Sequence, residues 1–264
     1  MFKKGGVSIM NSEFLSPVSV DEAVRLMGDG CAYFAGGTET EHLHSRVCAS
    51  TFILLSGVDG LDGIDASGDV VRIGSMVSFT KALKAPEVPE YFKEALHFCG
   101  SLQKRNMATI GGNIASWRCD SYLIPTLLAA GAQLEIVDEA LCREISLEEY
   151  GRNRDSLKNA LITAVIIPSE AAGVKVISKR YANTVESHAY LTIAMGKIND
   201  SYRIGLAIKG SGIFTPDITS WGVAWKMADV KDDMFGSEAY KRYLTGVTLD
   251  DMYEKLSGEG GDQV

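Results

Sequence analysis

The sequence predicts an α+β fold made of three consecutive blocks, and three observations support this prediction. A strand–helix–strand pattern occupies about the first 58 residues. Turns rich in glycine and aspartate begin at Asp59. After residue 173, apolar and polar residues alternate in several short runs, which is typical of antiparallel strands. The domains are therefore predicted at residues 10–60, 61–172 and 173–258.

The first block begins with a capping-box pattern. Ser19 can cap a helix while Glu22, three residues later, reaches back to it. Apolar residues recur at helical spacing until Gly28 ends the helix. The run "CAYFA" then predicts a short buried strand, followed by a Gly36-Gly37 turn and a second short helix from Thr38. "STFILLSGV" predicts the next strand.

The second block predicts a mixture of strands and helices, and the third predicts antiparallel strands followed by a helix. "DVVRIGSMVSF" alternates like a strand, and "PEVPEYFKEALHFCG" predicts a helix that ends at Gly100. "SYLIPTLLAAGAQLEIV" predicts a helix, a stop at Gly131 and a strand, and "NALITAVIIP" predicts a strand that ends at Pro168. The runs "VKVISKRY", "AYLTIAMGKI" and "YRIGLAIKGS" predict an antiparallel meander with a turn at Asn199-Asp200. "SEAYKRYLTGVTLDDMYEKL" predicts a closing amphipathic helix.

Composition and charge exclude several classes of function. The chain has 26 lysines and arginines against 34 aspartates and glutamates, a net charge of −8, without a basic cluster. Nucleic acid is therefore not an expected partner. No apolar run reaches the length of a membrane span, and no segment resembles a signal peptide. We therefore expect no membrane span and a cytoplasmic location.

Cysteine and histidine spacing predicts no metal site. The closest cysteines, Cys31 and Cys48, are 17 residues apart, whereas zinc and iron–sulfur sites usually contain a CxxC-like pair. An odd total of 5 cysteines also argues against a disulfide framework. His42 and His44 are two residues apart, which on a helix places them on different faces.

Two glycine-containing stretches, "AGGTETEHLH" and "ATIGGNIAS", are the candidates for a binding site. A Gly-Gly pair lets the backbone take positive φ and removes the Cβ atoms that would block a ligand. Consecutive N–H groups in such a turn bind anions, so two turns could hold a pyrophosphate from both sides. Neither GxGxxG nor a P-loop is present, and each stretch alone is more simply a strand-to-helix connection.

The motifs make the chain similar to the FAD-binding (medium) subunits of molybdenum hydroxylases, the xanthine, carbon monoxide and nicotinate dehydrogenase group. "AGGTET" resembles the family's AGGTDL, and "QKRNMATIGGNIA" resembles QIRNxGTIGGNIA. "LITAVIIP" and "GSEAYKRYLTGV" resemble later family strings, so the resemblance runs from about Phe14 to Leu256. It implies a two-subdomain FAD-binding fold of the vanillyl-alcohol-oxidase/PCMH type, followed by a small α+β C-terminal domain with an antiparallel sheet.

The resemblance also implies a set of FAD-binding residues, with no catalytic and no metal-binding residue. The first stretch would wrap the FAD, with its glycine amides on the pyrophosphate, and the second stretch would supply the second nest. An apolar residue would pack on the cofactor, and a lysine would approach the isoalloxazine. The residues are Tyr33, Phe34, Ala35, Gly36, Gly37, Thr38, Glu39, Thr40, Thr109, Ile110, Gly111, Gly112, Asn113, Ser116, Ile162 and Lys179.

The chain departs from the family pattern after the second stretch. The family commonly has an aspartate where this chain has Tyr122, and the nearest acid is Asp120. "SWRCDS" replaces a stretch of small residues and proline, so Trp117 and Arg118 are expected to alter access to the cofactor.

By this resemblance the chain is an electron-transfer subunit of a multi-subunit molybdopterin-dependent dehydrogenase or hydroxylase. FAD would pass electrons from the clusters of a [2Fe–2S] small subunit to NAD⁺ or another acceptor, and a molybdopterin-containing large subunit would oxidise the substrate. A stand-alone flavin oxidoreductase is one alternative, although a C-terminal block of about 90 residues is small for a substrate-capping domain. A cofactor-free interaction module is the other, and the intact GGT and TIGGN strings weigh against it.

Overall fold

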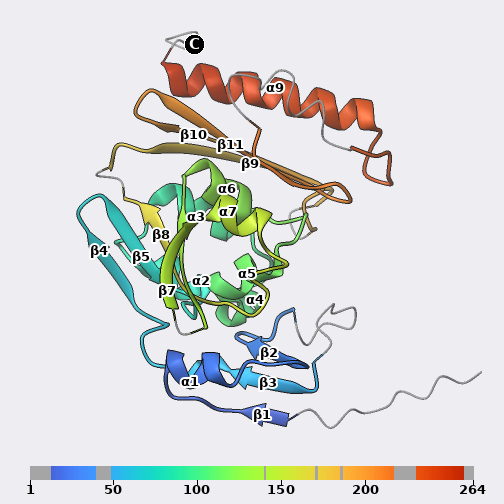
Figure 1. The fold of residues 1–264 in the computed structure, drawn as a ribbon. Helices are drawn as coiled ribbons and strands as arrows, with labels where there is room; N and C mark the ends of the chain where they lie inside the picture. The colour runs from blue at the N-terminus through green and yellow to red at the C-terminus, as the bar shows by residue number, and fades with distance from the viewer. Residues whose placement is uncertain are drawn as a thin grey trace, which may run out of the picture.

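The computed structural model describes residues 13–39, 49–139, 141–169, 172–184, 187–216 and 230–258. Three sheets follow one another from the bottom to the top of Figure 1, with a group of short helices beside the middle sheet and one long helix across the outer face of the top sheet. The predicted α+β class is confirmed. No described helix is long and apolar enough to cross a membrane.

The first sheet is parallel, with strand order β1-β3-β2. Ser19 caps the first helix by accepting a hydrogen bond from the Glu22 N–H at 3.2 Å. The Glu22 carboxylate reaches back to the Val18 N–H at 2.8 Å, one residue before the expected Ser19. Thr38 and Glu39 lie in a turn, and the rest of the second helix predicted there falls outside the described residues. The elements are β1 (Glu13–Leu15), α1 (Val20–Arg25), β2 (Cys31–Phe34), β3 (Thr51–Leu54) and the 3-10 turn η1 (Leu55–Gly57).

The second sheet is antiparallel, with strand order β4-β5-β8-β6-β7. Its apolar face and the helices enclose the largest core cluster, in which Phe79 and Phe92 are fully buried. Gly131 has φ 70° directly after α6, as predicted from its position. The strands are β4 (Ile64–Ser67), β5 (Val70–Gly74), β6 (Gln133–Asp138), β7 (Leu141–Ser146) and β8 (Leu161–Pro168); the helices are α2 (Phe79–Lys84), α3 (Glu90–His97), α4 (Leu102–Met107), α5 (Ile110–Ser116), α6 (Leu123–Ala129) and α7 (Leu147–Arg152).

The third sheet is the predicted antiparallel meander, with strand order β12-β11-β10-β9. Helix α9 covers one face and α6 packs on the other (Figure 1). The contact with α6 depends on glycine: a Cβ atom on Gly196 would lie 2.1 Å from the Ala129 carbonyl oxygen. On Gly205 it would lie 2.2 Å from the carbonyl oxygen of Pro125. The elements are β9 (Lys175–Tyr181), β10 (Leu191–Ile198), β11 (Ser201–Ile208), β12 (Gly212–Phe214) and α9 (Glu238–Ser257).

Each sheet draws its strands from one of the three ranges proposed as domains. The blocks also share contacts, since Leu161 of β8 packs with the apolar residues of the first block. The domain boundaries at 60 and 172 stay a prediction.

Candidate functional site

The first glycine stretch forms a turn directly after β2. Gly37 has φ 71°, which glycine adopts without strain. Gly36 lies against the chain before α5, where a Cβ atom would be 1.8 Å from the Met107 carbonyl oxygen. The amides of residues 36–39 have no hydrogen-bond acceptor among the described residues. Such a row of N–H groups is suited to an anion.

The second stretch is a helix rather than the predicted turn. Thr109 caps α5, and neither Gly111 nor Gly112 has a positive φ, so the interpretation as a positive-φ nest is wrong. The glycines serve close packing instead. A Cβ atom on Gly111 would lie 2.5 Å from the Cβ of Ser75, and one on Gly112 would lie 2.8 Å from the Thr109 hydroxyl oxygen.

The amides at the start of this helix are already used. All four N–H groups of residues 110–113 donate to acceptors within the protein, so these residues offer no row of free amides to an anion. In chain order, the acceptors are the carbonyl oxygens of Val77 (3.0 Å) and Ser75 (2.8 Å), the Thr109 hydroxyl (3.1 Å) and the Thr109 carbonyl oxygen (3.0 Å).

Two cavities adjoin these stretches, one apolar and one polar. Residues of the first turn and of α5 line both of them, so the cavities flank the same structural elements. The apolar cavity is lined by Tyr33, Ala35, Leu55, Ser75, Met76, Gly111, Gly112, Ala115, Ala160, Leu161 and Ile162. The polar cavity is lined by Thr38, Glu39, Cys99, Lys104, Ala108, Asn113, Arg118, Asp120, Ser121, Tyr122 and His188.

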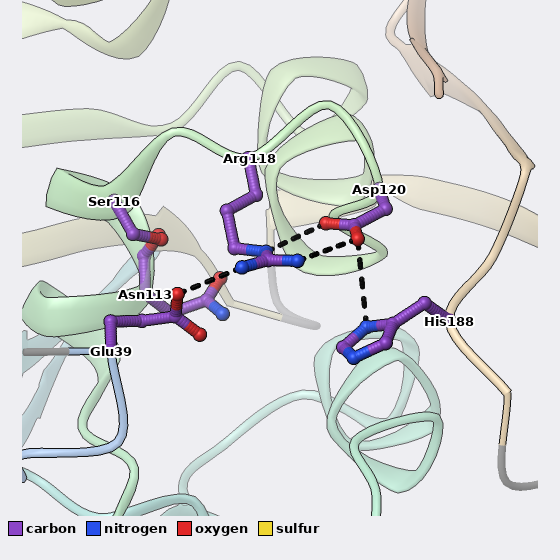
Figure 2. A network of polar contacts seen from close by, with 6 residues as sticks. All are labelled: Glu39, Asn113, Ser116, Arg118, Asp120 and His188. Atoms are coloured by element: carbon purple, nitrogen blue, oxygen red, sulfur yellow. Dashed lines mark hydrogen bonds and ion pairs between the residues drawn. The ribbon is translucent and has the colours of Figure 1, made fainter. Parts of the chain in front are cut away.

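A network centred on Arg118 forms part of the polar wall (Figure 2). The Nε and Nη2 atoms of Arg118 donate to the two carboxylate oxygens of Asp120, each at 2.8 Å. Its Nη1 atom donates to Glu39 in the first turn at 2.9 Å. His188, from the loop before β10, lies 3.6 Å from Asp120 on the far side. The network therefore joins residues from all three predicted domains.

Burial and charge shift the pKa values of this network. The pKa of Asp120 is lowered: burial opposes ionisation, but the hydrogen bonds and the charge of Arg118 outweigh burial. The pKa of the His188 imidazole is also lowered, first by burial and then by Lys104, Arg118 and Lys209, against the attraction of Asp120.

These shifts predict that acid destabilises the protein. Both folded-state pKa values lie below the ordinary values of 6.5 for His188 and 3.8 for Asp120, so the unfolded chain binds more protons as the pH falls. The free energy of unfolding should decrease below pH 6.5 through His188, and again below pH 3.8 through Asp120. Denaturant titrations at several pH values measure this slope. In His188→Gln the decrease nearest pH 6 should be smaller, and an unchanged slope would contradict the assignment.

Tyr122 stands where the resemblance places an aspartate, and it lines the same polar cavity. The pKa of its hydroxyl is raised, first by burial and then by the neighbouring Cys99. Tyr122 therefore stays neutral and cannot replace a carboxylate.

Half of the predicted site residues line the two cavities: Tyr33, Ala35, Gly111, Gly112 and Ile162 line the apolar one, and Thr38, Glu39 and Asn113 the polar one. Gly36, Gly37 and Thr109 line neither cavity. Phe34 packs against Phe14 and Phe52, and Ile110 is buried in the core. The Ser116 hydroxyl donates to the Asn113 carbonyl oxygen at 2.7 Å. Lys179 lies over the Tyr181 ring and lines neither cavity. Thr40 lies outside the described residues.

Two buried polar atoms test what kind of ligand fits. Asn113 Oδ1, in the polar cavity, and Ser75 Oγ, in the apolar cavity, have no hydrogen-bond partner within the described part of the chain. Buried polar atoms are normally paired, so a ligand with hydroxyl groups would satisfy them. An apolar recess, free turn amides and a polar recess together fit an extended ligand with a flat ring and phosphates. No group of three or more His, Cys, Asp or Glu in the described residues could hold a metal ion.

A family match identifies the chain as an FAD-binding component of an oxidoreductase. Residues 10–170 match the family of FAD binding domains in molybdopterin dehydrogenases. The chain belongs to this family, which confirms both the predicted resemblance and FAD as the cofactor.

Two relatives and two solved structures are similar to this chain. YgfM of Escherichia coli K12 is 29% identical over 97% of this chain and 100% of its own length. The medium subunit of nicotine 6-hydroxylase from Paenarthrobacter nicotinovorans is 28% identical over 61% of this chain and 60% of its own length. Quinoline 2-oxidoreductase from Pseudomonas putida 86 shares the fold with a TM-score of 0.76 at 19% identity, covering 89% of this chain and 93% of that one. Carbon monoxide dehydrogenase from Oligotropha carboxidovorans has a TM-score of 0.76 at 20% identity, with 90% and 94% covered.

Proposed function

We propose that the chain is the electron-transfer subunit of a multi-subunit molybdopterin-dependent dehydrogenase or hydroxylase of the xanthine dehydrogenase type. A [2Fe–2S] small subunit would deliver electrons, NAD⁺ or another acceptor would receive them, and a molybdopterin-containing large subunit would oxidise the substrate. Family membership carries this proposal, and the medium subunit of nicotine 6-hydroxylase is a relative with such a subunit name. We further propose a cytoplasmic location, since the four described cysteines are free thiols.

The side chains around the two cavities would bind and orient the cofactor. The apolar cavity, with Tyr33, Met76 and Ile162, suits a flat ring system. The amides of residues 36–39, which have no acceptor in the described part of the chain, suit a phosphate. Asn113 Oδ1 would accept a hydrogen bond from a hydroxyl group. FAD itself supplies the ability to take up and release electrons singly or in pairs.

The protein isolated from its native host with an affinity tag tests this proposal. We expect about one FAD per chain after denaturation, together with two further polypeptides, molybdenum and iron. A substrate-reduced complex should pass electrons to the flavin before the external acceptor. A colourless chain that also fails to take up added FAD would overturn the proposal. So would a chain that oxidises an organic substrate unaided, because this is the behaviour of a stand-alone enzyme.

A further inference from the structure

Arg118 is directed into the polar cavity by an unusual backbone turn. Trp117, at the C-cap of α5, has φ 43° and ψ 49°, a left-handed conformation that is strained for a residue other than glycine. The Trp117 ring holds this conformation by packing on Gly151, where a Cβ atom would lie 2.4 Å from it. The ring also contacts Tyr150 edge-on, with centroids 5.9 Å apart. The chain therefore accepts strain at Trp117 and places the next side chain at the site.

The guanidinium of Arg118 is held in place, but not all of its N–H donors are used by the described residues. Asp120, whose side chain is 7% exposed, accepts two of its N–H groups, and Glu39 accepts a third. A guanidinium has five N–H donors. The other two have no acceptor among the described residues, and the side chain remains 38% exposed at the cavity. Asp120 thus acts as a positioning residue for a donor that faces the ligand site.

The site needs such a cation for a ligand with two phosphates. No lysine or arginine lies within either glycine stretch, and the amides of residues 110–113 are already used. The Glu39 carboxylate, next to the free amides of the first turn, would repel a phosphate unless its charge were neutralised. Among the described residues that line the polar cavity, the cations are Lys104 and Arg118. Only Arg118 also contacts the first turn.

We propose that Arg118 binds the diphosphate of FAD and at the same time neutralises Glu39 beside it. Figure 2 shows the guanidinium between Glu39 and Asn113 on one side and Asp120 and His188 on the other. Its planar, permanently charged fork is well suited to phosphate oxygens. In this chain the charge supplied by Arg118 takes the place of the second amide nest. The inference rests on the proposed function only in that the chain holds FAD.

Titration of the FAD-free full chain with FAD and, separately, with riboflavin, which lacks phosphate, tests this role. Flavin fluorescence gives both dissociation constants. We expect Arg118→Gln to weaken FAD binding about 10- to 100-fold, the range for loss of charge-assisted hydrogen bonds. Riboflavin binding should change by less than about twofold, since it offers no phosphate to the cation. Arg118→Lys should recover part of the FAD affinity, and added salt should weaken FAD binding less in Arg118→Gln than in the wild type.

Matched controls separate this role from a structural one. Arg72 makes a similar two-bond ion pair with Glu135, on the middle sheet and outside both cavities, so Arg72→Gln should leave both dissociation constants unchanged. Because Arg118→Gln leaves Asp120 without its partner, Arg118→Gln/Asp120→Asn removes the unpaired buried charge and should show the same selective loss. Equal FAD affinity in wild type and in a folded Arg118 variant overturns this inference alone. An equal loss for riboflavin does the same. A wild-type chain that binds no FAD overturns the proposed function as well.

Discussion

Gly36→Ala should weaken FAD binding by up to about 100-fold. The new Cβ atom would lie 1.8 Å from the Met107 carbonyl oxygen and 2.7 Å from its carbon, and backbone atoms cannot move aside as a flexible side chain can. The turn with the free amides must then separate from the segment before α5. Overpacking usually costs about 1–3 kcal/mol. When this energy destabilises the FAD-bound conformation, FAD binding weakens by up to about 100-fold.

Flavin fluorescence titration measures this loss, and Gly28→Ala is the control. Gly28 lies in the same block, and a Cβ atom there would have no heavy atom within 4 Å. The control should bind FAD as the wild type does and be at least as stable, since replacing glycine at an unstrained position reduces the entropy of the unfolded chain. Wild-type affinity in Gly36→Ala would show that the turn does not need its close contact with Met107.

Gly205→Ala should cause a large loss of stability, about 1–3 kcal/mol in the free energy of unfolding. Its Cβ atom would lie 2.2 Å from the Pro125 carbonyl oxygen and 2.8 Å from the Pro125 carbonyl carbon, so helix α6 could no longer rest on β11. Gly196→Ala should have a similar effect, because its Cβ atom would lie 2.1 Å from the Ala129 carbonyl oxygen of the same helix.

Urea unfolding of the variants gives the comparison. Gly63→Ala serves as the control, because the nearest atom to its Cβ would be a carboxylate oxygen of Asp65 at 3.6 Å, an ordinary contact. An unfolding midpoint for Gly205→Ala equal to that of the control would mean that α6 and the sheet can separate at no cost.

The regular elements could be predicted because their signals are local. The meander follows from alternation within each strand, and the turn at Asn199, with φ 54°, follows from a residue type that tolerates this conformation. The stop at Gly131 after α6 follows in the same way. Each signal lies within a few residues of the element that it defines.

Helix α5 was missed because its deciding contacts are not local. Adjacent glycines are typical of turns, but the Thr109 cap and the close approach of Gly111 to Ser75 favour a helix. Nothing in the string "TIGGN" identifies the strand end against which it packs. The family resemblance placed the stretch at the cofactor as a second amide nest, but the N–H groups of residues 110–113 already have acceptors within the protein.

The polar network could not be predicted from the sequence for a related reason. Arg118 and Glu39 are 79 residues apart, and His188 comes from the loop before β10. Charged residues are common on surfaces, so only the fold shows which of them meet. The departure "SWRCDS" was the one signal in the sequence, and it pointed to altered access rather than to a charge at the site.

The polar cavity has walls from three parts of the chain: Glu39 before β3, Asn113 and Arg118 around α5, and His188 before β10. A ligand bound there stabilises every part that must be folded to form those walls, by an amount set by its concentration relative to its dissociation constant. Binding of a ligand in the polar cavity should therefore make the unfolding of these parts more cooperative. With the cavity filled, the C-terminal sheet cannot open without releasing the ligand, so a bound ligand adds to the polar network that already joins the three blocks.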